Sequence, residues 1–163
     1  MTSRYRLVVE RLRYDDDTAF ALADDAATLA RIVRTVPPDR LRGTKFGEWT
    51  AVEVIGHLAD MAEVFAERVR RIATEERPRL PSVDQDKLAA QRRNNERDPL
   101  ELATRVRLAH GEIVQILTSA AIRSRLGVHE EQGEVDAAHV AAYQARHAHE
   151  HVSELASAFP PIR

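Results

Sequence analysis

The chain contains no cysteine. This absence excludes disulfide bonds, a CxxC redox pair, a thiolate zinc site and a cysteine nucleophile. Aromatic residues make up only 5% of the sequence, and no apolar run approaches the roughly 20 residues that a membrane-spanning helix needs. The net charge is −2 with both signs interspersed, so no basic face indicates nucleic-acid binding. We therefore expect neither a membrane nor a nucleic acid as a partner.

The remaining composition is typical of a soluble helical protein. Hydrophobic residues make up 44% and charged residues 31%, which indicates a globular chain and not a disordered one. Alanine is abundant, which favours helices over strands. A length of 163 residues suits a single domain covering residues 1–163. The charged N-terminus does not resemble a signal peptide, so we expect a cytoplasmic protein.

Four helical stretches are separated by helix-breaking segments. They are expected over residues 17–36, 50–76, 99–121 and 136–158. Prolines follow the first, second and fourth stretches, and Pro99 suits the first turn of the third. Thr50 and Glu53 predict a capping box at the start of the second. Four helices of about 20 residues, each about 30 Å long, predict an all-α fold, a four-helix bundle.

The connections between these helices are expected to be mostly irregular. Residues 39–49 predict a polar loop, and residues 124–135, with two glycines, predict another. The proline-containing segment 77–98 is expected to hold one short helical turn at residues 87–92. Residues 4–9, RYRLVV, are compatible with a brief strand or an irregular arm.

Two of the seven histidines lie together on the apolar face of the fourth helix. At about 100° per residue, His147 and His151 fall inside this face and occupy neighbouring turns. The other residues of the face are Val140, Tyr143, Ala148, Val152, Leu155 and Phe159. His139 falls on the polar side and His149 near the border, so we expect both at the surface.

Two further histidines are expected to point inward. His57 lies just inside the edge of the apolar arc of the second helix, and His110 lies near the middle of the arc of the third. A buried imidazole needs a partner. The pair at i and i+4 can present two nitrogens to one metal ion, although two separately hydrogen-bonded core histidines fit equally well. For His110 a hydrogen-bonded core histidine is the preferred interpretation, and His129 lies in a predicted loop.

Other polar residues on the predicted helices carry less information. Asp60 and Glu63 fall on the polar side of the second helix, where solvated carboxylates are expected. Tyr143, one turn before His147, is either a packed aromatic residue or a donor to a bound substrate. The Glu-x-x-His motifs of di-iron bundles are missing from the expected helices, which argues against that class.

The segment EWTAVEVIGHLAD, residues 48–60, resembles the signature of the DinB/YfiT-like superfamily of metal-dependent proteins. That signature is a tryptophan and a helix cap, then a helix with a histidine followed by Leu-x-Asp. Residues 125–133 and the closing H-x-x-x-H helix are also similar to this family. The resemblance implies a four-helix bundle with up-down-down-up connectivity, often as a homodimer. Residues 77–98 would then form the crossover that this connectivity requires.

The resemblance also implies a metal site made of His57, His147 and His151. Three imidazoles with open coordination positions are typical of catalytic sites, with zinc or nickel favoured and iron, manganese or copper also compatible. His110 and Tyr143 are candidates for a substrate contact or for support of the ligands. Characterised relatives include transferases and isomerases that use low-molecular-weight thiols, and a chain without cysteine would take such a thiol from outside.

Two functional hypotheses follow from these residues and this resemblance. The first is a metal-dependent enzyme with a small-molecule substrate, either a thiol-dependent S-transferase or a hydrolase. The second is a non-catalytic, stress-related bundle in which the metal is structural or absent. A structural site would normally close with a fourth protein ligand, for which His110 is the internal candidate.

Overall fold

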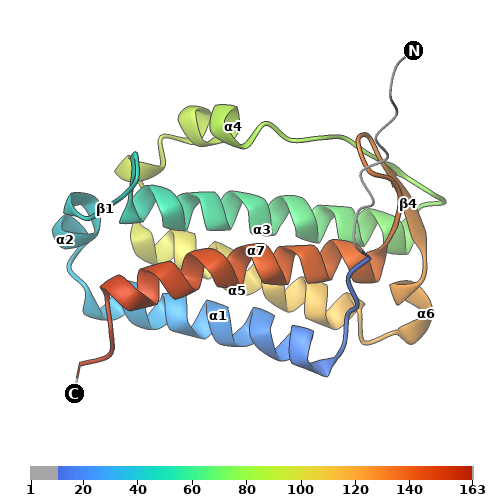
Figure 1. Cartoon of the computed structure of the whole chain (residues 1–163), viewed down its shortest axis with the longest axis horizontal. Coiled ribbons are helices and arrows are strands. Elements are labelled where there is room, and N and C mark those ends of the chain that lie inside the picture. The colour runs from blue at the N-terminus through green and yellow to red at the C-terminus, as the bar shows by residue number, and fades with distance from the viewer. Residues whose placement is uncertain (1–10, 163) are drawn as a thin grey trace, which may run out of the picture.

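Four long helices lie side by side and form the bundle (Figure 1). They are α1 (Asp16–Thr35), α3 (Ala51–Thr74), α5 (Pro99–Ile116) and α7 (Ala137–Ala158). The computed structural model describes residues 11–162, so the segment 4–9 lies outside the described residues. Helices α1 and α3 each pack against both α5 and α7. The expected four-helix bundle is therefore confirmed.

The order of the helix directions is up-down-down-up (Figure 1). Helices α3 and α5 run the same way, so the chain must return along the whole bundle between them. The crossover that does so contains β3 (Arg79–Leu80), α4 (Gln85–Arg92) and the 3₁₀ helix η1 (Asn94–Glu96). Helix α4 includes the helical turn expected at residues 87–92.

The helix ends follow the local sequence with one exception. The capping box is confirmed, because the Thr50 hydroxyl accepts the Glu53 N–H at 3.2 Å and the Glu53 carboxylate accepts the Thr50 N–H at 3.1 Å. Helix α5 ends at Ile116, before the expected residue 121, and the short α6 (Ala120–Arg123) follows. The Arg123 guanidinium donates to the Leu117 carbonyl at 2.7 Å and so satisfies a group left free by the helix end.

Both connections expected to be loops contain short regular elements. Residues 39–49 fold into most of α2 (Pro38–Gly43) and the antiparallel pair β1 (Lys45–Phe46) and β2 (Trp49–Thr50).

The prediction of an irregular loop over residues 124–135 was wrong. That segment forms an antiparallel hairpin of β4 (Leu126–His129) and β5 (Gly133–Asp136). The crossover strand β3 pairs parallel with β4. The backbone of β4 thus finds hydrogen-bond partners in a segment far away in the sequence. The hairpin leads directly into α7.

The core runs along the bundle between the four helices. Its fully buried side chains include Leu29, Ile55, Leu102 and Leu155, one from each long helix. This matches the apolar arcs, because each helix turns its hydrophobic stripe inward. Within residues 11–162, no helix combines the length and the hydrophobicity that crossing a membrane requires.

Candidate metal centre

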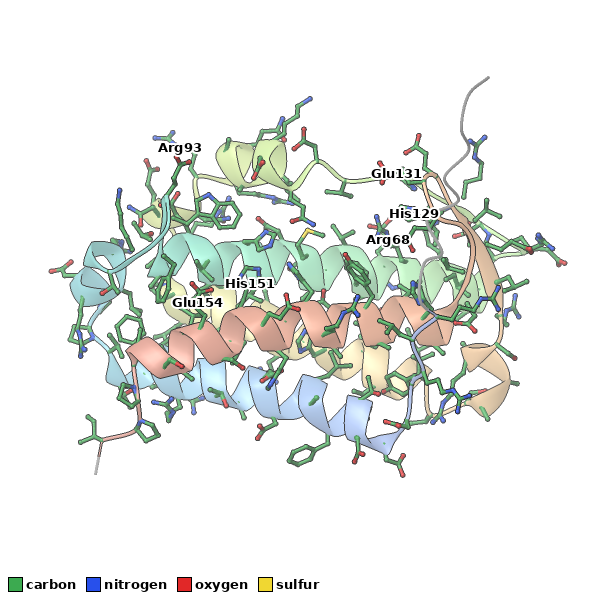
Figure 2. All side chains as sticks on the ribbon, viewed as in Figure 1. Arg68, Arg93, His129, Glu131, His151 and Glu154 are labelled. Carbon is green, nitrogen blue, oxygen red and sulfur yellow. The ribbon has the colours of Figure 1, made fainter. Side chains whose placement is uncertain are left out.

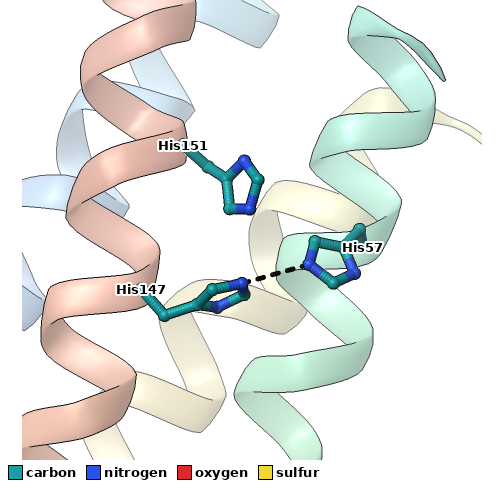
Figure 3. Close-up of side chains that lie close together, drawn as sticks. All are labelled: His57, His147 and His151. Carbon is teal, nitrogen blue, oxygen red and sulfur yellow. Dashed lines mark hydrogen bonds between the residues drawn. The ribbon is translucent and has the colours of Figure 1, made fainter. Parts of the chain in front are cut away.

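Three histidine side chains meet between α3 and α7 (Figure 3). The Nε2 atoms of His57 and His147 lie 3.2 Å apart. His151 completes the group, in which one ring nitrogen from each residue lies within 4.8 Å of the others. The ring centroids are 4.8–5.1 Å apart. The structure therefore brings together the three histidines that the family resemblance implied.

The helices fix the position of each ring. His147 and His151 occupy successive turns of α7, so both reach the same stretch of the interface with α3. His57 lies in the second turn of α3 and is only 3% exposed, more buried than its place at the edge of the apolar arc indicated. The Trp49 ring lies 4.9 Å from the His57 ring and covers it from β2.

Burial keeps the three imidazoles neutral. It lowers the pKa of His57 to about 3, helped by repulsion from His147 and His151. Burial and the neighbouring His151 likewise lower the pKa of His147 to about 4. Burial also lowers the pKa of His151, although Glu154 and Glu150 oppose the effect. At neutral pH the rings therefore offer uncharged nitrogens, which is the form that binds metals.

The distances fit a shared metal ion. Two nitrogens bound to one tetrahedral ion at about 2.0–2.1 Å are about 3.3 Å apart, close to the 3.2 Å between His57 and His147. The buried Nδ1 atom of His147 has no hydrogen-bond partner among the described residues. Within residues 11–162 the group holds three potential ligands, so a bound ion would keep a position for a water molecule or a substrate.

His110 does not join this group. It is 1% exposed, and its Nδ1 lies 2.8 Å from the Leu22 carbonyl oxygen. Its Nε2 lies 3.1 Å from the Gln144 amide nitrogen. Because both ring nitrogens have partners inside the core, the interpretation as a hydrogen-bonded core histidine is the one that the structure supports.

The expectation of a surface position was correct for His149 and wrong for His139. The His149 side chain is 64% exposed. His139 is only 4% exposed, because the chain before α1 and the β4–β5 hairpin cover the start of α7. The Leu12 N–H donates to its Nδ1 at 3.1 Å, and the Gln132 side-chain oxygen lies 3.4 Å from its Nε2.

Asp60 was also expected at the surface and is instead 3% exposed. Its carboxylate accepts from Asn94 at 3.1 Å and from Arg105 at 2.9 Å. These partners belong to η1 and α5, so Asp60 links the crossover to two helices one turn from His57. Glu63 lies nearer the surface, as expected, where Arg105 also donates to it.

A cavity of about 160 Å³ lies further along the same interface, and its lining includes none of the three histidines. Met61, one turn after His57, and Tyr143, one turn before His147, both line it. The Tyr143 ring stacks on Phe65 with centroids 5.7 Å apart, so this residue is a packed aromatic that also borders a cavity.

Sequence reasoning missed two residues of the cavity wall, Arg68 on α3 and His129 on the hairpin (Figure 2). No local signal could have found them. The cavity exists only because the hairpin and the crossover cover that part of the α3–α7 interface.

Fold and site together define a helical bundle that carries a three-histidine group between two of its long helices. Residues 21–155 match the family model of the DinB superfamily. The chain therefore belongs to the DinB superfamily. No curated protein matches it significantly.

Two solved structures share the fold. YfiT from Bacillus subtilis, described as a probable metal-dependent hydrolase with an unusual four-helix bundle topology, is 22% identical with a TM-score of 0.75. That match covers 88% of this chain and 86% of YfiT. The mycothiol-dependent maleylpyruvate isomerase is 16% identical with a TM-score of 0.67, over 86% of this chain and 60% of the isomerase.

Proposed function

We propose that His57, His147 and His151 bind a divalent metal ion and that the protein is a metal-dependent enzyme acting on a small molecule. The observation that carries this proposal is the convergence of three uncharged imidazoles with ring nitrogens within 4.8 Å of one another. Zinc and nickel suit such a nitrogen donor set best, and iron, manganese and copper are further candidates.

A divalent metal at this site would supply Lewis-acid activation of a water molecule or of a thiol. The chain's own residues prepare the site for it. Helices α3 and α7 hold the rings in place, and Trp49 shields His57 from solvent. Because the chain has no cysteine, a thiol substrate must come from outside. The reaction is therefore a hydrolysis or a transfer to an external low-molecular-weight thiol.

The two solved structures support both reactions. YfiT is described as a probable metal-dependent hydrolase, and the isomerase depends on the thiol mycothiol. A test with two assays separates them. The zinc-loaded or nickel-loaded protein is incubated with p-nitrophenyl esters, and separately with mycothiol or bacillithiol and an electrophile. Metal-dependent ester cleavage identifies a hydrolase, and metal-dependent consumption of the thiol identifies an S-transferase.

The alternative of a non-catalytic, stress-related bundle has less support. A structural zinc site normally has four protein ligands, and the group in residues 11–162 has three. His110, the candidate for the fourth, already binds Leu22 and Gln144.

Metal binding itself is tested by calorimetry and elemental analysis of the purified protein and two variants. His151→Ala should abolish tight zinc binding and leave the fold intact, because it removes one of three ligands from a half-buried position. His149→Ala, a matched change two residues away on the exposed side of α7, should bind zinc like the wild type. If His149→Ala loses the metal and His151→Ala keeps it, the ligand assignment is wrong.

We further propose that the protein is a cytoplasmic homodimer. Phe20 on α1 and Leu108 on α5 support self-association, because these large apolar side chains are 69% and 59% exposed. Sedimentation at micromolar concentration should give twice the 18.4 kDa mass of one chain. A monomer would contradict the dimer and leave the metal site unaffected.

A further inference from the structure

The cavity that begins one helical turn from the histidine group has the size of one small organic molecule. Its volume of about 160 Å³ is close to the roughly 150 Å³ of an engineered cavity that binds benzene. Phe65, Val135 and Val140 give it apolar walls. The polar side chains that line it come from α3, α7, the crossover and the β4–β5 hairpin. Arg68, His129 and Glu131 gather at one end of it (Figure 2).

Arg68 brings a positive charge to the cavity wall. Its side chain is half-buried over the Phe65 ring, with the guanidinium carbon 4.9 Å from the ring centroid. One nitrogen donates to the Pro81 carbonyl at 2.9 Å. Arg68 makes no ion pair with a carboxylate of residues 11–162. A half-buried cation without a counter-ion is unfavourable, so this wall favours an anion.

Two histidines on the same wall present N–H groups. His129 Nδ1 accepts the backbone N–H groups of Glu131 at 3.1 Å and Gln132 at 3.2 Å, so its proton is on Nε2. His139 Nδ1 accepts the Leu12 N–H, so its Nε2 also carries the proton. The Gln132 side-chain oxygen lies 3.4 Å from this Nε2, which is long for a hydrogen bond.

Arg68, His129 and His139 therefore give the cavity three donor side chains. The buried Ser82 hydroxyl on its wall has no partner among the described residues. The carboxylate that lines the cavity is that of Glu131, which is exposed, so water screens its charge. The charge of the half-buried Arg68 therefore favours a negatively charged ligand.

We propose that this cavity binds the carboxylate group of a small apolar acid, with Arg68 as its main contact. The hydrocarbon part of the acid lies against Phe65 and Val140, and the neutral histidines donate to the remaining carboxylate lone pairs. The binding of the anion depends on the cavity alone. The role of this acid as the substrate rests on the proposed function. Met61 and Tyr143 place the cavity one helical turn from the histidine group, so a bound acid would lie near the metal site.

Benzoate is a suitable probe, because its ring and carboxylate match the size and the donors of the cavity. Titration of the full-length protein, followed by NMR, should show saturable shifts for benzoate and binding at least about 10-fold weaker for the neutral benzamide. Arg68→Met should weaken benzoate binding about 10- to 100-fold. Arg70→Met is the matched control: this exposed arginine pairs with Glu112 away from the cavity, and benzoate binding should not change.

A second set of variants separates this proposal from the metal site. His151→Ala should still bind benzoate, which excludes direct ligation of benzoate to a metal ion. If the wild type binds no metal but still binds benzoate through Arg68, only the proposed function fails. If Arg68→Met does not fold, Arg68→Lys replaces it in the test. This variant keeps the charge, so it should bind benzoate more weakly than the wild type does, and more tightly than the wild type binds benzamide.

Three outcomes with benzoate and benzamide would overturn the anion site. They are the absence of saturable benzoate binding, equal binding of benzamide, and unchanged affinity in both Arg68 variants. Inorganic phosphate that binds as tightly as benzoate would also overturn it, because the apolar walls would then contribute nothing.

Discussion

Acidification from pH 7 to pH 5 should destabilise the metal-free protein through His57. The folded-state pKa of this ring is about 3, and its ordinary value is 6.5. Between these values the unfolded chain binds a proton that the folded chain does not, so the free energy of unfolding falls as the pH falls. The contribution of neutral His57 to the free energy of unfolding is complete above about pH 6.5 and disappears progressively towards about pH 3.

The magnitude follows from the width of this interval. A pH of 5 lies about 1.5 units below the ordinary pKa, and each unit corresponds to about 1.36 kcal/mol. The free energy of unfolding should therefore fall by about 2 kcal/mol. His57 is only 3% exposed, so water screens little of this effect. His147, with its pKa lowered to about 4, acts in the same direction.

Urea denaturation of the chelator-treated protein measures this loss. The wild type and the His57→Gln variant are compared at pH 7 and pH 5, so that groups present in both proteins cancel. The wild type should lose about 2 kcal/mol more than the variant over this interval. If both lose the same free energy within about 0.5 kcal/mol, His57 is not held neutral by its surroundings and the reasoning fails.

Three further predictions concern packing and the metal. Phe65→Ala should lower the free energy of unfolding by about 3–5 kcal/mol, because the ring is only 6% exposed, whereas Phe20→Ala, 69% exposed, should change it by less than about 0.5 kcal/mol. Gly56→Ala should destabilise by about 1–3 kcal/mol in chemical denaturation, since its new Cβ would lie 2.2 Å from the Asn94 side chain. Gly111→Ala, with open space around it in α5, should instead stabilise by about 0.4–1 kcal/mol. Zinc at 100 times its Kd should raise the free energy of unfolding by about 2.7 kcal/mol, and a chelator should remove that gain; unchanged thermal midpoints with zinc would contradict a native metal site.

The helices and the inward pair of histidines could be predicted from the sequence because their causes are local. The capping box at Thr50, the prolines and the 3.6-residue apolar period act within one or two turns. The same period places His147 and His151 on one face of α7. The end of α5 was placed too late, because the contact that satisfies it comes from Arg123 beyond the helix.

The errors at Asp60 and His139 share one cause. Both residues lie on the polar side of their own helix, and a helical projection takes that side to face water. In the structure, Asn94 of the crossover covers Asp60, and Leu12 and the hairpin cover His139. A projection of one helix contains no information about a segment that packs on it from elsewhere in the chain.

Helical periodicity alone places the two histidines of α7 at a common point, since four residues make slightly more than one helical turn. The third histidine of the group is 90 residues from His147 in the chain, and it was identified by resemblance to a family. His57 meets this pair through the packing of α3 on α7, which sets the distance between the His57 and His147 rings. The cavity with Arg68 and His129 likewise required the folded chain, since its walls come from two helices, a hairpin and a crossover that only the packing of the bundle brings together.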